Sequence, residues 1–448
     1  MRFLRVGIPF WEQPGICSVP QFLLLIRFGD ENGTMRCWLK LGCGVLFALA
    51  GCQRHAPQAD RPVELRVLME PDGRGAWREL FAEFERQNPD VRVSMIEGPA
   101  TTDAREDMYI QSLLGGSGDY DLVYADVIWI PKFAAAGWLE DLTGRWPKAE
   151  WDDFVPATIE GGTFEGRIYR VPTQLNGGIL YYRKDLLDGI GAAPPATFAE
   201  LEALAKRLQV SGHRSGFVWQ GRQYEGLTCN FLEVLGGFGG FWIRDKTREV
   251  GLDRPEAEQA LKFLCRSVGT ISPPGVTTYA EEESRLLFLS GGAVFLRNWP
   301  YVSNLLADAS TARVGEIGIA PMPAEQGRRP AATFGGAGFS IVKNSPNKDA
   351  AWRLIEFVSS PSSVKFLNER AGLQPPRKSF YAQSSDPRQK ALFEALQYTV
   401  PRPALPQYAQ ASDILQRYVS AALTGQLTPG EALRRAASET RLLLKGAP

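Results

Sequence analysis

Aromatic residues stand beside planar polar residues and glycine in three short strings of this sequence. The strings are WQG at residues 219–221, YEG at 224–226 and NWPY at 298–301. Aromatic rings pack against the C–H faces of a pyranose, and amide, carboxylate and guanidinium groups bond its neighbouring hydroxyls in pairs. A single tryptophan is more often part of a core than of a ligand site. Because the pattern recurs in a chain with eleven tryptophans, we expect these strings to form a binding site for a neutral polyol.

Charge and histidine content argue against most catalytic and nucleic-acid functions. Fifty basic residues balance fifty acidic residues, so there is no basic field of the kind that nucleic acid requires. The only histidines are His55 and His213, which leaves little scope for a Ser-His-Asp triad or a histidine-based metal site. We therefore predict a binding protein with no catalytic residues, no metal, no cofactor and no nucleic-acid partner.

Two other functions fit parts of the pattern. A glycoside hydrolase places two acids on opposite sides of the scissile bond, and only Asp126 and Glu225 invite such a pairing. A polyamine-binding protein needs several acids with aromatic residues. A binder of phosphate esters uses glycine-rich helix N-termini or a GxxxxGK[ST] loop, and the glycine-rich stretch 236–240 lacks the lysine. A protein that binds a polyamine or a sugar phosphate is the main alternative, ahead of the hydrolase.

The N-terminal residues 1–51 have the character of a signal region. Cationic Arg36 and Lys40 precede an apolar run at 41–49, which is too short for a stop-transfer helix. The string LAGC at 49–52 resembles the bacterial lipobox, which implies a lipoprotein signal peptide over 35–51 and lipidation of Cys52. The alternative is an uncleaved anchor or a buried helix.

We expect residues 52–62 to tether the protein to the membrane, at a periplasmic or cell-surface location. Residues 1–34 fit no targeting pattern, and we interpret them as the product of a start codon assigned too early.

The cysteines do not form a disulfide framework. Four of the six lie within the first 52 residues, which leaves Cys229 and Cys265 in the body of the chain. We expect two separate buried thiols, because free cysteine is among the most buried residue types. A bridge between the two is the alternative in an oxidising compartment.

Strand and helix patterns alternate along the chain and must position the candidate site. Residues 63–69 alternate like a strand, and 76–87 carry apolar residues at helical spacing. Strands at 91–96 and 120–124 with helices at 103–114 and 130–137 then imply parallel βαβ units. After residue 172 the pattern restarts, with strands expected at 178–183, 216–219 and 293–296, and helices at 198–208, 255–267, 281–289, 350–358, 364–369, 411–423 and 429–445.

Several segments resemble the sugar-binding proteins of extracellular solute-binding protein family 1, its archaeal trehalose/maltose-binding members above all. The resemblance covers the chain from Val63 onward, and the strings occur in the family's order and spacing. They are ADVIW (125–129), GWL (137–139), GILYYRKD (178–185), GFVWQGRQYEGL (216–227), ISPP (271–274), RNWPY (297–301) and VPRP (400–403).

The resemblance implies an α/β, two-lobed periplasmic-binding-protein fold. Each lobe is a sheet flanked by helices, and a three-segment hinge joins the lobes around a sugar. We expect crossovers near 169–172, 322–330 and 357–363. The N-lobe then comprises 63–171 plus 325–360, and the C-lobe comprises 172–324 plus 361–445.

The resemblance also implies a set of ligand-binding residues. Asp126 and Arg105 would bond sugar hydroxyls from the N-lobe, Trp299 would be the stacking platform of the C-lobe, and Arg402 would supply a guanidinium fork. The two glycines would let backbone amides approach the ligand. The full set is Arg105, Asp126, Asn176, Trp219, Tyr224, Glu225, Tyr279, Arg297, Asn298, Trp299, Gly335, Gly336 and Arg402.

Several of these residues have structural alternatives. Asp126 could cap the helix that follows it, and Arg297 and Arg402 could belong to ion pairs. Trp219 could fill the core, and Glu225 could be a solvated acid at a helix start.

The chain departs from the family pattern at three places. It has Ala337 where relatives carry an aromatic residue and Asn176 where they carry an aspartate. The first loop, 69–75, lacks the expected glutamate, although Glu70, Asp72 or Arg74 could substitute for it. These changes suggest a ligand that is different from or smaller than trehalose or maltose, such as sucrose or glucosylglycerol.

Together these features predict a monomeric substrate-binding lipoprotein of an ABC importer. Its expected partners are a small neutral α-glucoside, the membrane permease subunits, and the membrane itself through the lipid anchor at Cys52.

Overall fold

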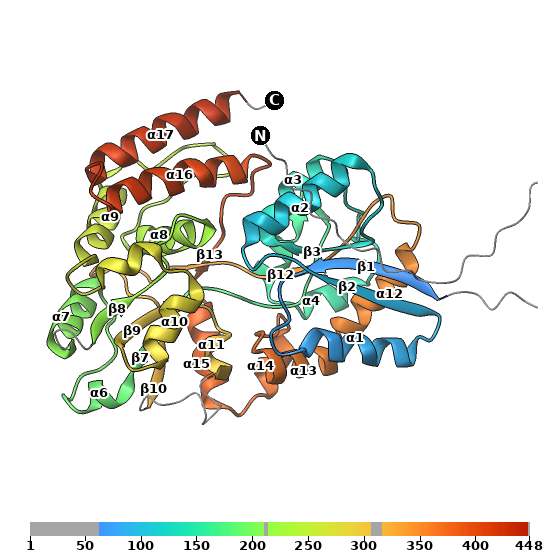
Figure 1. Ribbon diagram of the computed structural model, residues 1–448, viewed down its shortest axis with the longest axis horizontal. Helices are drawn as coiled ribbons and strands as arrows, with labels where there is room; N and C mark the ends of the chain where they lie inside the picture. Colours follow the sequence, from blue (N-terminus) through green and yellow to red (C-terminus); the bar gives the residue numbers. More distant parts are fainter. Residues whose placement is uncertain (1–61, 210–213, 306–315, 447–448) are drawn as a thin grey trace, which may run out of the picture. The chain divides into compact units, whose positions relative to one another are not determined.

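The computed structural model of the protein describes residues 62–209, 214–305 and 316–446 (Figure 1). By its contacts, the chain from residue 59 onward is one compact unit. The signal region, Cys52 and both histidines lie outside the described residues. Within the described part of the chain, no helix is both long enough and apolar enough to cross a membrane.

The first sheet has the strand order β2-β1-β3-β12-β6. Strand β1 pairs in parallel with β2 and β3, as the βαβ pattern predicted, whereas β12 lies antiparallel between β3 and β6. Helices α1 and α12 pack on this sheet. The elements are β1 (Val63–Met69), α1 (Ala76–Gln87), β2 (Val91–Glu97), α2 (Thr102–Gly115), β3 (Leu122–Asp126), β6 (Val171–Pro172), β12 (Ala337–Ile341) and α12 (Lys348–Val358).

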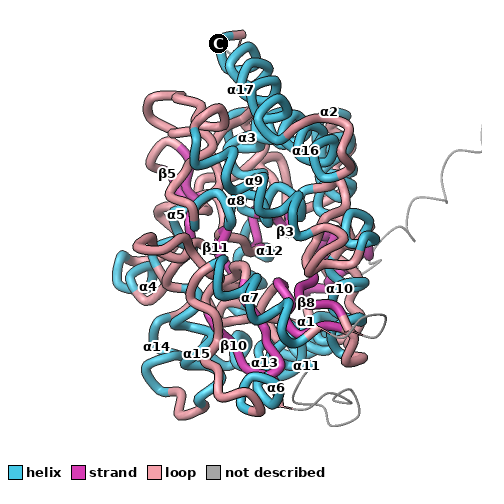
Figure 2. Tube along the Cα trace, turned by 90° about the vertical axis from the view of Figure 1, so that its left-hand side faces the viewer, coloured by secondary structure: helices cyan, strands magenta, loops and turns pink. Residues whose placement is uncertain are grey.

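The second sheet has the order β10-β7-β9-β8, with β8 and β9 parallel and the other pairs antiparallel. Helix α8 packs against α9 and α16, and α16 and α17 lie side by side (Figures 1 and 2). The elements are β7 (Ile179–Arg183), α7 (Phe198–Leu208), β8 (Ser215–Val218), α8 (Glu225–Gly237), α9 (Pro255–Ser267), α10 (Glu281–Leu289), β9 (Ala293–Asn298), β10 (Ile317–Ala320), α16 (Tyr408–Leu423) and α17 (Pro429–Lys445).

Shorter elements complete the fold. They are η1 (Val127–Trp129), α3 (Ile130–Ala135), α4 (Lys148–Asp152), α5 (Pro156–Glu160), β4 (Thr163–Phe164), β5 (Arg167–Ile168), α6 (Lys184–Asp188), η2 (Pro274–Thr278), α11 (Val302–Leu305), β11 (Ala332–Thr333), α13 (Pro361–Ala371), α14 (Lys378–Gln383), α15 (Pro387–Leu396) and β13 (Thr399–Val400).

Side chains of β1 alternate between two cores, as the period of a strand requires. Leu65 and Val67 belong to a cluster shared with α1 and α12, and Leu68 belongs to the cluster that continues into the second sheet. Each sheet therefore has helices packed against it, and the predicted α/β class is confirmed.

The chain passes between the two sheets three times. It leaves β6 at Pro172 and enters β7 at Ile179. On the way back, Glu325 N still donates to Gly237 O and Thr333 N to Glu233 of α8, so these contacts favour a return after β11, near 334–336, instead of the predicted 322–330. Helix α13 packs on α1 and α12, whereas α15 packs on β7 and β10. These contacts favour a third crossover near 384–386 instead of the predicted 357–363. The lobe boundaries drawn from the sequence stay a proposal, in which the return to the first lobe is moved to residues 334–336 and the last return to the second lobe to residues 384–386.

Candidate functional site

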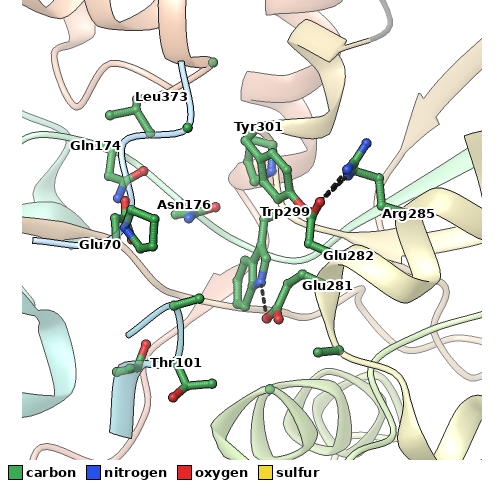
Figure 3. A pocket seen from close by; sticks show the side chains of 18 of the residues that line it. Glu70, Thr101, Gln174, Asn176, Glu281, Glu282, Arg285, Trp299, Tyr301 and Leu373 are labelled. Carbon is green, nitrogen blue, oxygen red and sulfur yellow. Dashed lines mark hydrogen bonds and ion pairs between the residues drawn. The ribbon is translucent and has the colours of Figure 1, made fainter. Parts of the chain in front are cut away.

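A cavity of about 830 Å³ opens between loops that follow strands of both sheets (Figure 3). Glu70 follows β1 directly and Trp299 follows β9 directly, while Asn176 lies on the passage from β6 to β7. Figure 3 shows Glu70, Asn176 and Leu373 on one side, facing Trp299 and Glu281 on the other. Ligands of open α/β folds bind beyond the carboxyl ends of the strands, and this cavity has that position.

Trp299 is the aromatic residue that the second sheet places most directly at the cavity. Strand β9 is buried along its whole length, and Trp299 follows it as a half-buried side chain. Its indole Nε1 donates to Glu281 Oε1 at 3.2 Å, and its carbonyl accepts from the Tyr181 hydroxyl at 3.0 Å. The ring is therefore held at both its indole N–H and its backbone.

Arg105 of α2 forms part of the opposite wall. Its Nη1 donates to the carbonyls of Pro99 and Ala100, both at 2.7 Å, and its Nη2 lies 3.5 Å from Glu70 Oε2. The Nε of Arg105 is buried without a hydrogen-bond partner. The guanidinium is thus fixed by the loop before α2.

Arg402 joins the two lobes at the base of the cavity. Its side chain is only 3% exposed, and it donates to Asp126 Oδ1 at 2.9 Å and to Glu225 Oε1 at 2.7 Å. Glu225 also accepts from the Tyr408 and Ser412 hydroxyls, at 2.5 and 2.6 Å. Burial alone would lower the pKa of Arg402, but the neighbouring carboxylates raise it well above its usual value. Arg402 therefore stays charged.

Six of the thirteen predicted ligand-binding residues line the cavity. They are Arg105, Asn176, Tyr224, Glu225, Trp299 and Arg402. The three residues of the first loop that could replace the missing glutamate also line it, namely Glu70, Asp72 and Arg74.

The structure places four of the predicted ligand-binding residues elsewhere, among protein groups. Trp219 is fully buried and donates to Ser272 Oγ at 3.1 Å, so it fills the core. Arg297 is paired with Glu233, and the amide of Asn298 bonds Glu281 O and Trp299 N. Tyr279 stands before α10 and outside the cavity lining.

Asp126 is a partner of Arg402 rather than part of the cavity wall. Its Oδ1 also accepts from Ile128 N at 3.2 Å, which is the capping contact that the sequence suggested. Its carboxylate therefore serves the ion pair and the cap together.

The two glycines lie behind the cavity wall. A Cβ on Gly335 would be 3.5 Å from Trp299 Cζ3, and Gly336 has a φ of 132° with its carbonyl accepting from Arg170 Nη1. Only glycine readily adopts that φ. These positions therefore shape the backbone next to Trp299, outside the lining itself.

Other lining residues were not among the predicted ones, and their signals in the sequence were weak. The acidic run at 281–283 opens α10, where acids are ordinary because they favour a helix N-terminus. Arg285 lies in the same helix, and Gln174 and Gln374 stand singly in loops. Arg222 and Tyr301 lie within the strings at 216–227 and 297–301, where other residues were predicted to bind the ligand. The added lining residues include Gln174, Arg222, Glu281, Glu282, Glu283, Arg285, Tyr301 and Gln374.

Cys229 also lines the cavity, and Cys265 is the other free thiol of the described residues. The two cysteines are separate, as predicted, but only Cys229 is buried, whereas Cys265 is partly exposed. Burial raises the pKa of the Cys229 thiol well above its ordinary value, so this cysteine stays protonated and unreactive.

Comparison with known proteins gives consistent results. The profile of the family described as bacterial extracellular solute-binding protein matches residues 70–365. A probable ABC transporter-binding protein of Deinococcus radiodurans is 34% identical over 355 residues, which cover 76% of this chain and 84% of the relative. The maltotriose-binding protein of Pyrococcus abyssi is 27% identical over 317 residues, covering 68% and 64%. The maltose-bound structure of T. maritima MalE3 is 39% identical with a TM-score of 0.79, covering 85% of this chain and 100% of that one.

Proposed function

The chain belongs to the bacterial extracellular solute-binding protein family, and from this premise we propose that it captures a small neutral α-glucoside for an ABC importer. It acts as a monomer that delivers this sugar to the membrane permease. Proteins of this family bind solutes and are not enzymes, so the glycoside hydrolase alternative is excluded. The ligand is of the trehalose, sucrose, maltose or glucosylglycerol type.

The composition of the cavity wall carries this proposal. Six carboxylates and five guanidinium groups line the cavity, so the wall is close to electrically neutral. A polyamine favours an acidic wall, and a sugar phosphate favours a basic one. Trp299 supplies a ring for stacking, and the acids and arginines supply paired hydrogen bonds to hydroxyls.

The names of two similar proteins support an α-glucoside. One relative is named for maltotriose, and the T. maritima structure holds maltose. Both sugars are glucose units in α linkage, which is the class that we propose for this chain.

A ligand panel tests the assignment. Thermal unfolding of the purified protein would be measured with maltose, maltotriose, trehalose, sucrose and glucosylglycerol. Spermidine and glucose 6-phosphate would represent the two alternative ligand classes, polyamines and sugar phosphates. A ligand at 100 times its dissociation constant stabilises the folded state by about 2.7 kcal/mol. Stabilisation by spermidine or glucose 6-phosphate alone would refute the neutral sugar.

We further propose that a lipid on Cys52 anchors the protein outside the cytoplasm. The family description supports a periplasmic or extracellular location, and Cys52 itself lies outside the described residues. Cells that express the protein would incorporate radiolabelled palmitate into it, and Cys52→Ser would abolish the label and release the protein from membranes. Equal labelling of the variant would contradict the anchor.

A further inference from the structure

A fully buried ion pair lies directly behind Trp299. Arg297 and Glu233 are both 0% exposed. Arg297 Nε donates to Glu233 Oε2 at 2.7 Å, Nη2 donates to Glu233 Oε1, and Nη1 donates to Gln220 Oε1 at 2.9 Å. Acceptors thus surround the guanidinium in its own plane, which prevents it from rotating and leaves its flat faces free for stacking.

The indole ring of Trp299 lies on one of those faces. The Arg297 Cζ is 4.0 Å from the ring centroid, a cation–π contact. The N–H of the same ring donates to Glu281 (Figure 3). One contact therefore fixes the plane of the ring and the other fixes its rotation within that plane, while the rest of the ring lines the cavity.

Several elements hold the ion pair in place. Glu233 belongs to α8, and its Oε1 also accepts from Thr333 N of β11 at 3.1 Å. A Cβ on Gly178, just before β7, would lie 1.9 Å from Glu233 Oε1, so glycine leaves the room that the carboxylate occupies. The Gln220 amide donates to Ser284 Oγ and Arg297 O, at 2.8 and 2.9 Å. Glu233, Gln220 and Arg297 therefore all have hydrogen-bond partners within the protein.

Stability alone does not explain such a pair. Well-packed apolar residues of similar volume are often as stabilising as a buried ion pair, because the desolvation of two charges offsets their attraction. The contact that apolar residues would not reproduce is the flat, rigid, charged support under Trp299.

We propose that Arg297 and Glu233 are positioning residues that hold the Trp299 ring in its sugar-stacking orientation before the ligand arrives. This inference deepens the proposed function and depends on it for the identity of the ligand. A side chain that is already ordered loses little freedom on binding, which is the advantage of preorganisation. Arg297 and Glu233 act on the ligand through Trp299 and do not touch it.

The test compares two variants with the unmodified protein. The double variant Arg297→Met with Glu233→Gln removes both charges together, so neither is left buried alone. Arg297→Lys keeps the charge opposite Glu233 but removes the planar face. Proteins labelled with 5-fluorotryptophan are examined by ¹⁹F NMR, with the Trp299 resonance assigned from Trp299→Phe, and maltose affinity is measured by calorimetry.

We expect both variants to broaden or shift the Trp299 resonance and to weaken maltose binding by about three- to tenfold, the range for one side chain that must be ordered on binding. A folded variant with an unchanged resonance and unchanged affinity would overturn the inference. If the double variant does not fold, the resonance and the affinity of Arg297→Lys alone test the inference. If the unmodified protein binds none of the α-glucosides of the panel, the proposed ligand class fails, and the ¹⁹F resonance still decides whether Arg297 orders the ring.

The chain contains a matched control in the first lobe. Arg377 is 4% exposed, donates to Asp153, Glu150 and Ser359 O, and stacks its Cζ 4.4 Å from the Phe154 ring. It is outside the cavity lining. Arg377→Met should lower stability while leaving both the Trp299 resonance and the maltose affinity unchanged. A loss of affinity equal to that of the Arg297 variants would mean that general loosening, and not positioning, explains both.

Discussion

At the scale of single residues, Trp299 is the ring that a sugar in the cavity would meet. Its N–H is bound to Glu281 and one face lies on Arg297. Trp299→Ala should weaken maltose binding by about 1–3 kcal/mol, or roughly tenfold to a hundredfold, because the stacking surface is removed. Calorimetric titration of the purified variant measures this directly.

The control for Trp299 is Trp146, a half-buried tryptophan of the first lobe. Its indole also donates to a carboxylate, Glu356 Oε1, at 3.1 Å, and it lies outside the cavity lining. Trp146→Ala should leave the maltose affinity unchanged. Equal affinity of the two alanine variants would remove Trp299 from the site.

Asp185 gives a pH-dependent prediction. Hydrogen bonds from Arg183, with Nε to Oδ1 at 2.8 Å and Nη2 to Oδ2 at 2.6 Å, hold the pKa of Asp185 below its ordinary value of 3.8. A depressed pKa contributes stability above the unfolded-state pKa, and that stability is lost as the pH falls through the folded-state pKa. Asp185→Asn should therefore cost about 0.5–1 kcal/mol at pH 7, a figure reduced for solvent screening, and less at pH 3, which is already below the unfolded-state pKa.

Urea unfolding at the two pH values tests this difference. Asp188→Asn is the comparison, because Asp188 is an exposed acid that pairs with Lys184 on the same short helix. Its replacement should change stability by only a few tenths of a kcal/mol at either pH. A cost for Asp185→Asn that is the same at pH 3 and pH 7 would show that the charge of Asp185 is not the source of the effect.

The site could be predicted in part because the strings of aromatic and polar residues mark loop positions near strand ends. Trp299 and Glu225 were found in this way. The strings do not reveal which way a side chain points, and so Trp219 and Arg297 were included although both lie inside the protein. Lining residues such as Gln174 and Gln374 stand alone in loops, and only the folded chain brings them together.

At the scale of elements, the amphipathic helices and most strands were predicted, the buried β9 among them, whereas the buried helix α8 was not. Helix α8 has buried residues on every side, so it lacks the apolar stripe with a period of 3.6 that predicts a helix. Strand β12 joins the first sheet from more than two hundred residues after β3. No local pattern indicates such a partner, and the resemblance to a known family supplied the two-lobed arrangement.

Gly338 of β12 lies at a point where the first sheet has no room for a side chain. A Cβ there would be 2.2 Å from Val171 O of the neighbouring strand. Gly338→Ala should therefore lower the free energy of unfolding by about 1–3 kcal/mol, as overpacking does. Chemical denaturation measures the change. Gly144→Ala, where nothing lies within 4 Å, should be close to neutral, and an equal loss in the two variants would contradict the close-packing explanation.

At the scale of the whole molecule, Arg402 makes an ionic contact between the lobes. Asp126 ends a strand of the first sheet and Glu225 begins a helix of the second lobe, so the guanidinium reaches both lobes at once. Such a contact forms only when the lobes are close together, and hinged binding proteins alternate between open and closed forms. The Asp126–Arg402 pair therefore favours closure even before a sugar is bound.

Asp126→Asn weakens this pair without leaving a buried charge alone, because Arg402 keeps Glu225. Loss of about 1–2 kcal/mol would shift the balance between closed and open forms by about fivefold to thirtyfold. Small-angle X-ray scattering of the ligand-free protein should therefore give a larger radius of gyration for the variant. Asp153→Asn weakens a comparable pair that stays within the first lobe and should leave the radius unchanged. If Asp126→Asn also leaves it unchanged, the lobes are held together by something other than Arg402, and Asp126 acts as the cap of the helical turn that follows it.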